Sequence, residues 1–583
     1  MGQTGSIPEP QPNEAINKQT SHNHSNHDKI SNDIMKKNFS SLETYSLEST
    51  FDNLSCLKDD KQKYLGFPEG AKIGSLLYRS FTYLATYPSP VHGENLLTLN
   101  GLLKAVAVYC DKIHDVILED RAKLIFESFA MHEEHSASGI TPKAGFSYGP
   151  ENSSHDTNDG EEGKPKLKIS SINLDDDAAF LRALGFQQSD DDKTHLVSKI
   201  LCTDMVEILA GIIWIMTISN SLSSYKSKEF ESLKSIKQLH EIVTPVVENM
   251  ARYDSNLRNL SRSQIFSSST FIKWTIFDDF MRRNIPNIFR DFIPFFYGQF
   301  LIGLTLSQHR EESIIMGPHL PKLDGKSENL NPANLALLSL MLPEETLKKK
   351  EWNCLYSGSK HGFSMNRFSS HVFKYNGPTL MIIHAEVTSN YNCNYHHTRV
   401  SKKENLLIGA YITDKWRSTT STRSCFGSAK CLLFELHPTF ESFPASQRNT
   451  NYVYYNPTFG IGFGGIDTPK STSNIGSKDT NSFVIQLDNT LQHGRYRNDA
   501  LKSMDTTYSL SASRTFFDKS FEVLEIEVFG LGGEGAREKQ KREWMWEEQE
   551  ATKRQSWKKH NSSEIDKDIL KMAGVLNENT KEP

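Results

Sequence analysis

Between Trp352 and Gly530 the chain alternates short apolar runs with turn-forming residues, and this pattern restricts the fold more than any other feature. Two of the runs, Thr379 to Ile383 and Lys430 to Leu436, lie between glycines or prolines. Apolar runs of this length between such residues predict buried β-strands. Several strands joined by turns, with only brief helical pattern between them, predict a β-sandwich flanked by helices.

The last run of this stretch, Phe521 to Phe529, alternates between apolar and acidic residues. Leu524, Ile526 and Val528 occupy one parity, and Glu525 and Glu527 the other. Successive side chains of a strand point to opposite faces. We therefore expect the three apolar side chains to cover a core and the two glutamates to meet solvent.

A glycine cluster at residues 460, 462, 464 and 465 precedes this strand. A phosphate-binding loop would continue with Lys-Ser or Lys-Thr and open a helix, and neither pattern follows. We expect these glycines to supply positive φ angles and close backbone approach instead.

These features belong to a series of motifs that stand in a fixed order. The series reads WNCLYSGSKHGFS (352–364), GPTLMIIH (377–384), LIGAY (407–411) followed by Trp416, CLLFELHP (431–438), NYVY (451–454), GIGFGG (460–465) and FEVLEIEV (521–528). It resembles the TLDc domain, whose motifs run from LY-x-G-x-x-H-G-x-S to F-E-V-x-x-I-E-V. We place this domain at residues 350–531. The resemblance implies a link to oxidative-stress protection and brings no agreed catalytic residues.

Composition narrows the class of protein. A chain of 583 residues has room for several domains, and its net charge of −5 does not favour direct nucleic-acid binding. Its seven cysteines form no CxxC pair, so neither a disulfide framework nor a zinc site is expected. We expect a reduced, cytosolic setting with no secretory signal and no membrane span.

The N-terminal segment, residues 1–68, is rich in Asn, Ser, His and Gln and is expected to be disordered. Its first six residues fit the N-myristoylation pattern Met-Gly-x-x-x-Ser, with Gly2 as the acceptor. One acyl chain binds a membrane only marginally. No basic cluster accompanies it and no cysteine precedes Cys56. We therefore expect a protein partner to supply the second anchoring signal.

Residues 69–345 are predicted to be an all-α region. Leu103, Val106, Cys110, Ile113 and Ile117 step by three and four, which predicts one apolar helix face. Similar patterns are seen at 196–218, 233–250, 271–289 and 331–342. A polar insert near 135–170 is predicted to be a loop or linker.

Two clusters of metal-ligating residue types occur in the sequence, and neither is expected to bind a metal ion. His22, His24 and His27 lie in the tail without a fold to fix them. Asp175 to Asp177 lack the Gly and closing Glu of a calcium loop and are expected to cap the following helix. No cofactor is expected.

Residues 534–583 are predicted to be a charged C-terminal helix and tail. Glu, Lys and Arg dominate 534–560, with Trp544 and Trp546 among them. The tryptophans either pack on the preceding domain or form part of a partner-binding arm. We take Trp544 and Trp546 as candidate partner-binding residues.

No catalytic motif is recognised. Cys425, Cys431 and several histidines are present, but no nucleophile elbow, metalloprotease helix, Walker sequence or dinucleotide fingerprint accompanies them. Cys431 lies in an apolar strand and is expected to be a packed thiol. We expect no enzymatic activity, and a thiol-dependent protective enzyme is the alternative.

The combination of an acyl acceptor, a helical region, a TLDc domain and a charged tail resembles the fungal family called restriction of telomere capping protein 5. The N-myristoylated, mTOR-associated TLDc proteins of animals share this plan. The resemblance implies a cytoplasmic adaptor, peripheral to the vacuolar membrane, that binds the vacuolar proton-pumping ATPase and influences its assembly. A cytosolic factor acting indirectly on telomere maintenance is the third hypothesis. The sequence leaves open the binding surface, the direction of the effect on assembly and the oligomeric state.

Overall fold

The computed structural model describes residues 29–56, 71–87, 97–113, 116–117, 120–133, 197–222, 236–267, 269–301, 320–349, 351–391, 397–419, 425–465, 483–500 and 506–573. The chain divides into two units: residues 131–198, and the rest of the chain. Of the smaller unit the structure describes strand β1 (Met131–Glu133) and the first two residues of β2 (Val197–Leu201). Gly2, the three tail histidines, the polar insert, Asp175 to Asp177 and Cys393 lie outside the described residues.

Part of the segment expected to be disordered is helical. Residues 29–38 form helix, and α2 spans Ser41–Cys56. Ile34 and Leu47 are buried in the same core as the following helices. The Glu43 carboxylate lies 2.9 Å from Lys112 Nζ. The expectation of disorder is therefore wrong for residues 29–56, because a few spaced apolar side chains and one paired carboxylate fasten a polar segment to folded helices.

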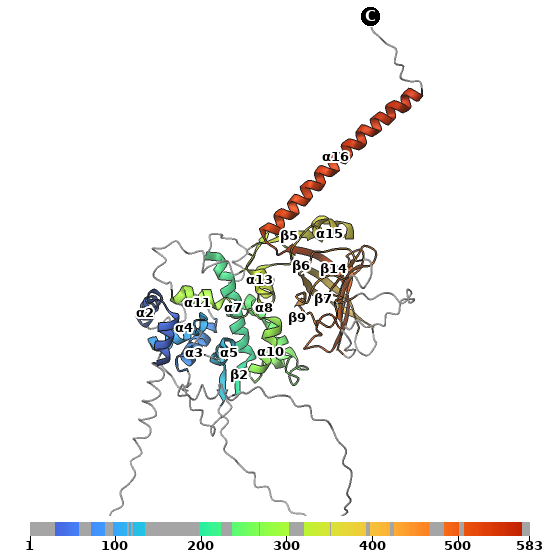
Figure 1. Ribbon diagram of the computed structural model, residues 1–583. Coiled ribbons are helices and arrows are strands. Elements are labelled where there is room, and N and C mark those ends of the chain that lie inside the picture. Colours follow the sequence, from blue (N-terminus) through green and yellow to red (C-terminus); the bar gives the residue numbers. More distant parts are fainter. Residues whose placement is uncertain are drawn as a thin grey trace, which may run out of the picture. The chain divides into compact units, whose positions relative to one another are not determined.

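The region that follows is helical, as expected (Figure 1). Its helices are α3 (Ile73–Ala85), α4 (Leu99–Tyr109), α5 (Arg121–Phe129), α7 (Cys202–Leu222), α8 (Ile236–Ala251), α9 (Arg262–Ile265), α10 (Trp274–Asn284), α11 (Phe292–Phe300), α12 (Pro332–Met341) and α13 (Glu344–Leu347).

Two of the expected helices begin later than their apolar patterns. Strand β2 precedes α7, and β3 (Phe271–Lys273) precedes α10; Lys199 to Leu201 of β2 pair antiparallel with β3. The stripe from Leu103 to Ile117 likewise outlasts its helix, since α4 ends at Tyr109, although Ile113 and Ile117 remain buried. The spacing of apolar residues indicates which side chains are buried, and the buried side chains here continue beyond the end of the helix.

The C-terminal half is built on one curled, almost wholly antiparallel sheet. Its strands are β4 (Lys322–Asp324), β5 (Glu351–Ser357), β6 (Thr379–Tyr391), β7 (His397–Ile412), β8 (Leu432–His437), β9 (Glu441–Pro444), β10 (Val453–Asn456), β11 (Gly460–Phe463), β12 (Phe483–Leu487), β13 (His493–Asp499) and β14 (Phe516–Gly530). The main path runs β10-β11-β12-β13-β14-β6-β7-β8-β9. Helices α14 (Gly358–His361) and α15 (Met365–Val372) follow β5. The expected class, mixed helices and strands with a helical N-terminal region, is confirmed.

Strand β14 is the centre of this sheet. One of its edges pairs with β6 from Asp518 to Gly530, and the other pairs first with β13 and then with β5. Aromatic side chains of β9 and β12 also meet, since the rings of Phe443 and Phe483 lie 4.7 Å apart. Strands far apart in the sheet order therefore close around one core.

The two faces of the sheet serve different cores. Along β6, Met381 and Ile383 belong to the core enclosed by the curl, whereas Leu380 and Ile382 belong to the core of the helical region. Strands β7 and β8 alternate in the same way. The helices thus pack on the outer face of the sheet. The domain limits expected from the sequence remain predictions.

Positive φ angles confirm the expected conformation at three of the four glycines in the cluster. Gly460, Gly464 and Gly465 have φ of 96°, 85° and 128°. A Cβ at Gly460 would lie 2.1 Å from the carbonyl oxygen of Leu487.

The chain's longest helix, α16, spans Glu534–Met572 and follows β14 after three residues. The expectation of a helix over 534–560 is confirmed. No helix within the described ranges is long and apolar enough to cross a membrane.

Candidate functional site

The glutamates of β14 do not face solvent, and the expectation from their alternation is wrong. Glu525 and Glu527 are 3% and 1% exposed, whereas Leu524 is 46% exposed. The register with β6 shifts between Val523 and Glu525, passing over Leu524. This β-bulge takes Leu524 out of the alternation, whereas Ile526 and Val528 lie in the core enclosed by the curl, as expected. Glu525 and Glu527 lie on the opposite face, and they are buried because residues 327–329 and the α14 turn cover that face.

Each buried glutamate fixes a preceding segment onto β14. Glu525 accepts a hydrogen bond from the Ser359 amide at 3.0 Å. Glu527 accepts one from Ser327 Oγ at 2.6 Å and one from the Asn329 amide at 3.2 Å. A buried carboxylate requires such donors. Together these contacts hold the α14 turn and the approach to α12 against the central strand.

The turn after β5 carries the motif Lys-His-Gly. The Ser357 amide donates to His361 Nδ1 at 3.1 Å, and Tyr356 Oη donates to the Gly362 carbonyl at 2.7 Å. The imidazole of His371, on α15, stacks on that of His361 with centroids 4.0 Å apart. Burial, together with neighbouring cationic groups, lowers the pKa of both histidines. The fold therefore disfavours the protonated form of both imidazoles.

The first turns of α16 contact His371 of this pair and Asp324 of β4. Gln540 Nε2 donates to the His371 carbonyl at 3.0 Å, and Arg537 pairs with Asp324 of β4 at 2.6 Å. The indole of Trp544 meets the His371 ring edge-on at 6.3 Å. The first three turns of α16 are thus attached to strand β4 and to helix α15.

The two candidate partner-binding tryptophans are placed differently. Trp544 contacts His371 and is 36% exposed, whereas Trp546 is 63% exposed beside Met545 at 60%. Trp544 therefore packs on the domain and is also partly exposed, whereas Trp546 is largely exposed to solvent. Gly2, the third candidate, lies outside the described residues.

The thiols that the structure describes are not activated. Burial raises the pKa of Cys110 and Cys202 to about 12 and that of Cys354 to about 11. Burial also raises the pKa of Cys425 and Cys431. A reactive cysteine needs the opposite shift, toward thiolate near neutral pH.

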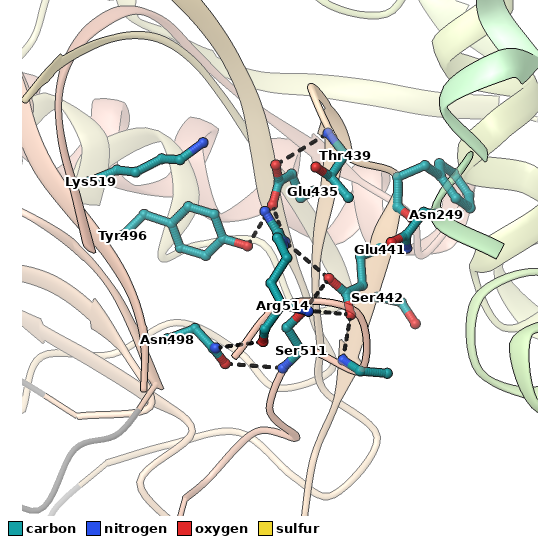
Figure 2. Close-up of polar contacts among 12 residues, drawn as sticks. Asn249, Glu435, Thr439, Glu441, Ser442, Tyr496, Asn498, Ser511, Arg514 and Lys519 are labelled. Carbon is teal, nitrogen blue, oxygen red and sulfur yellow. Dashed lines mark hydrogen bonds and ion pairs between the residues drawn. The ribbon is translucent and has the colours of Figure 1, made fainter. Parts of the chain in front are cut away.

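A buried charge cluster that we did not predict lies inside the curl (Figure 2). Arg514 Nη2 lies 2.6 Å from Glu435 and 3.0 Å from Glu441, and both glutamates are fully buried. Tyr496 Oη donates to Glu435 at 2.9 Å, and Ser511 Oγ to Glu441 at 2.7 Å. Burial opposes the charge of Arg514, but the two glutamates with Tyr496 raise its pKa well above the ordinary value.

Beside this cluster the sheet is tied to the helices. The Ser442 amide donates to Asn284 Oδ1 at 2.8 Å, and Asn249 Nδ2 donates to the Phe440 carbonyl at 2.8 Å. Asn249 is on α8 and Asn284 ends α10. Since both glutamates have their charge and hydrogen-bonding capacity met, the cluster fixes structure rather than offering an open reaction site. The sequence carries one signal of this cluster, since Glu435 interrupts an otherwise apolar run.

A groove of about 530 Å³ lies between α8, α12 and strands β6 to β8. His384, Asn405 and His437 line its sheet side, and Glu241 and Glu328 lie on the opposite side. Burial, and then His437, lowers the pKa of His384. Across the parts of the chain that the structure describes, no three His, Cys, Asp or Glu side chains are grouped so as to hold a metal ion.

A comparison with known protein families shows which domain contains these residues. The TLDc domain model matches residues 323–532, which run from β4 to just after β14. Residues 323–532 are therefore similar to the TLDc domain. The match contains the His361 turn, the buried glutamates and the Arg514 cluster, and it ends just before α16.

Relatives extend the likeness to the whole chain. Proteins named restriction of telomere capping protein 5 from Leptosphaeria maculans and Colletotrichum graminicola are each 24% identical, over 93% and 95% of this chain and 94% and 96% of their own. The protein of that name from Kluyveromyces lactis is 27% identical over 46% of this chain and 52% of its own. The fungal resemblance expected from the motifs is confirmed.

Proposed function

We propose that this TLDc protein is a non-enzymatic adaptor that binds a partner through its TLDc domain and α16. The observation that carries the proposal is the anchored base and exposed surface of α16: Gln540 and Trp544 hold it to helix α15, while Met545 and Trp546 face solvent. Large apolar side chains among charged neighbours are frequent anchors of protein interfaces.

The proposed partner is the vacuolar proton-pumping ATPase, and the proposed effect is on its assembly. TLDc resemblance is the support for this choice. Myristate on Gly2 would bring the protein to the vacuolar membrane, and binding to the pump would supply the second attachment that one acyl chain lacks. The relatives' name connects the family with telomere capping, which we propose is affected indirectly from the cytoplasm.

The test is affinity purification of pump subunits with variants of the full chain. Removing residues 534–583 should lower recovery, and Trp546→Ala should lower it about tenfold or more if this indole is an interface anchor. Glu548→Ala, an exposed change two residues away, is the matched control and should recover the subunits normally. Removing 352–530 should abolish recovery.

If the protein is instead a thiol enzyme, its cysteines and not its C-terminal tail should be needed for function. Replacing Cys354, Cys393, Cys425 and Cys431 together with Ser or Ala should leave pump association intact, because the three of these that the structure describes have raised pKa values. A folded cysteine variant that loses the cellular effect, combined with a tail deletion that behaves like wild type, would replace the adaptor by the enzyme.

A further inference from the structure

Two neighbouring cavities meet at Tyr411, close to the start of α16. Tyr411 and Glu345 line both of them. We call the one of about 370 Å³ the α16 cavity, because Ala536 and Lys539 of that helix form part of its wall. The other has a volume of about 450 Å³ and is lined by α13 and Lys430. We call it the α13 cavity.

The hydroxyl of Tyr411 lacks a hydrogen-bond partner. Tyr411 belongs to β7 and is only 5% exposed. No group of the described residues is hydrogen-bonded to its hydroxyl. Burial, with smaller contributions from Cys431 and Glu345, raises the pKa of Tyr411 to about 12, so the hydroxyl keeps its proton at neutral pH. Buried polar groups are nearly always paired, and an unpaired donor beside a cavity indicates an acceptor on a bound molecule.

The start of α16 adds positive charge and free donors to the same cavity. A Cβ at Gly533 would lie 3.3 Å from Lys349 Cδ, so the Lys349 side chain lies against the beginning of the helix. Lys349 and Lys539 line the α16 cavity, and neither is paired with any described residue. The first bond of the helix runs from the Arg537 amide to the Gly533 carbonyl. The amides of residues 534–536 therefore have no acceptor within the helix, and a glycine at 533 has no side chain to cap them.

We propose that the α16 cavity binds the phosphate group of a polyol phosphate, with Tyr411 donating a hydrogen bond and Lys349 and Lys539 supplying positive charge. Helix N-termini and lysines both favour phosphate. The α13 cavity holds the polyol. There the carboxylates of α13 accept hydrogen bonds from hydroxyl groups, and Lys430 donates to them.

One group opposes an anion in this place. Among the described residues that line the α16 cavity, Glu345 is the only acid. Its side chain is 78% exposed and lies 4.0 Å from Lys430. Because water and Lys430 offset the charge of so exposed a carboxylate, Glu345 should weaken phosphate binding without preventing it.

Calorimetric titration of the full chain tests the site with three probes: inositol monophosphate, inorganic phosphate and unphosphorylated inositol. Concentrations up to about 10 mM fill most of a site whose Kd is millimolar. Inositol monophosphate should bind, inorganic phosphate should bind more weakly because it leaves the α13 cavity empty, and inositol should give no measurable heat.

Substitutions assign the binding to these side chains. Lys349→Gln and Lys539→Gln should each lower the affinity for inositol monophosphate about tenfold, the effect of losing one charge-assisted hydrogen bond. Tyr411→Phe should also lower it, while leaving the melting temperature without ligand unchanged, because the hydroxyl has no partner in the fold. Glu345→Gln should raise the affinity. Lys541→Gln is the matched control, since it removes an exposed lysine of α16 outside both cavities.

Flotation with vesicles distinguishes a lipid headgroup from a soluble compound. The full chain carries Gly2→Ala here, so that no acyl group contributes. Binding to phosphatidylcholine vesicles that contain phosphatidylinositol monophosphate, displaced by free inositol monophosphate, would identify a lipid headgroup as the source. Calorimetric binding without flotation would identify a soluble polyol phosphate.

Three results would overturn the proposal: no heat with either phosphate probe, unchanged affinity in the Lys349, Lys539 and Tyr411 variants, or an equal loss in Lys541→Gln. The inference does not depend on the proton pump. A chain that binds no phosphate but recovers pump subunits would reject the site and keep the adaptor, and the converse result would do the reverse.

Discussion

At the scale of single residues, Gly464 illustrates a backbone requirement. Its φ is 85°, and a Cβ there would lie 2.7 Å from the Phe483 carbonyl oxygen. Gly464→Val should lower the free energy of unfolding by about 1–3 kcal/mol, because valine reaches positive φ only with strain. Urea denaturation measures the change. Gly535→Ala, at a helical glycine with open space around it, should cause little loss. A Gly464→Val protein of unchanged stability that had lost phosphate binding would support a ligand loop instead.

Glu527 illustrates a requirement for a buried acceptor. Its carboxylate takes hydrogen bonds from Ser327 Oγ and from the Glu328 and Asn329 amides. Glu527→Gln should reduce stability by about 1–3 kcal/mol, since the amide group turns a donor toward other donors.

Denaturation of Glu522→Gln provides the comparison for this substitution. Glu522 is an exposed glutamate of the same strand, and its change should have little effect. Equal stabilities of the two variants would mean that the acceptor at position 527 is not needed.

At the scale of elements, the His361–His371 stack joins α14, α15 and the base of α16. The folded state lowers the pKa of both imidazoles, so protons bind the unfolded chain more readily. Stability should be full above the ordinary histidine pKa of about 6.5 and should fall as pH drops below it. Urea denaturation at about pH 7.5 and 5.5 measures this loss.

The double variant His361→Gln with His371→Gln should lose less stability on acidification than wild type. His384 should keep part of the effect, because its pKa is also lowered. His493→Gln, at a side chain 65% exposed, is the control. An unchanged pH dependence in the double variant would contradict the assignment to the stacked pair.

The same scale shows what the sequence could and could not predict. Apolar patterning identified β6, β8, α8 and α12, because in each the apolar spacing matches a single element. Helix α16 was predicted instead from its opposite charges at helical spacing. Apolar patterning failed for the glutamates of β14, since segments distant in the sequence cover the face on which Glu525 and Glu527 lie, and the alternation does not show this. It also failed at α2, where the composition is polar and the buried contacts come from helices distant in the chain.

At the scale of the whole molecule, the helical region and the outer face of the sheet share one core. The charge cluster inside the curl was not predicted. Trp544 and Trp546 could be proposed from sequence because exposed aromatics stand out in a charged helix. Arg514 could not, because it lies in a polar loop and its partners, Glu435 and Glu441, are over seventy positions away. Only the fold brings these three charges together.

The same scale carries the prediction for Gly2. Gly2→Ala should move the protein from a membrane fraction to the soluble fraction without changing its melting temperature, because the acyl chain would be lost while the fold does not depend on it. Fractionation, with mass analysis of the N-terminal peptide, provides the measurement. Equal fractionation of both forms and an unacylated wild-type peptide would remove the anchor.

The continuity of β14 with α16 determines how the molecule would respond to mechanical force. Only Leu531 to Gly533 separate the two elements, so a pull on α16 acts along β14. That end of β14 is hydrogen-bonded to β6 on one side and to β5 on the other. These bonds lie across the strand and are loaded together in shear rather than opened one by one. When the protein is pulled through α16, the tension therefore acts on two rows of hydrogen bonds at once. We expect the helix to unwind before the strand slides.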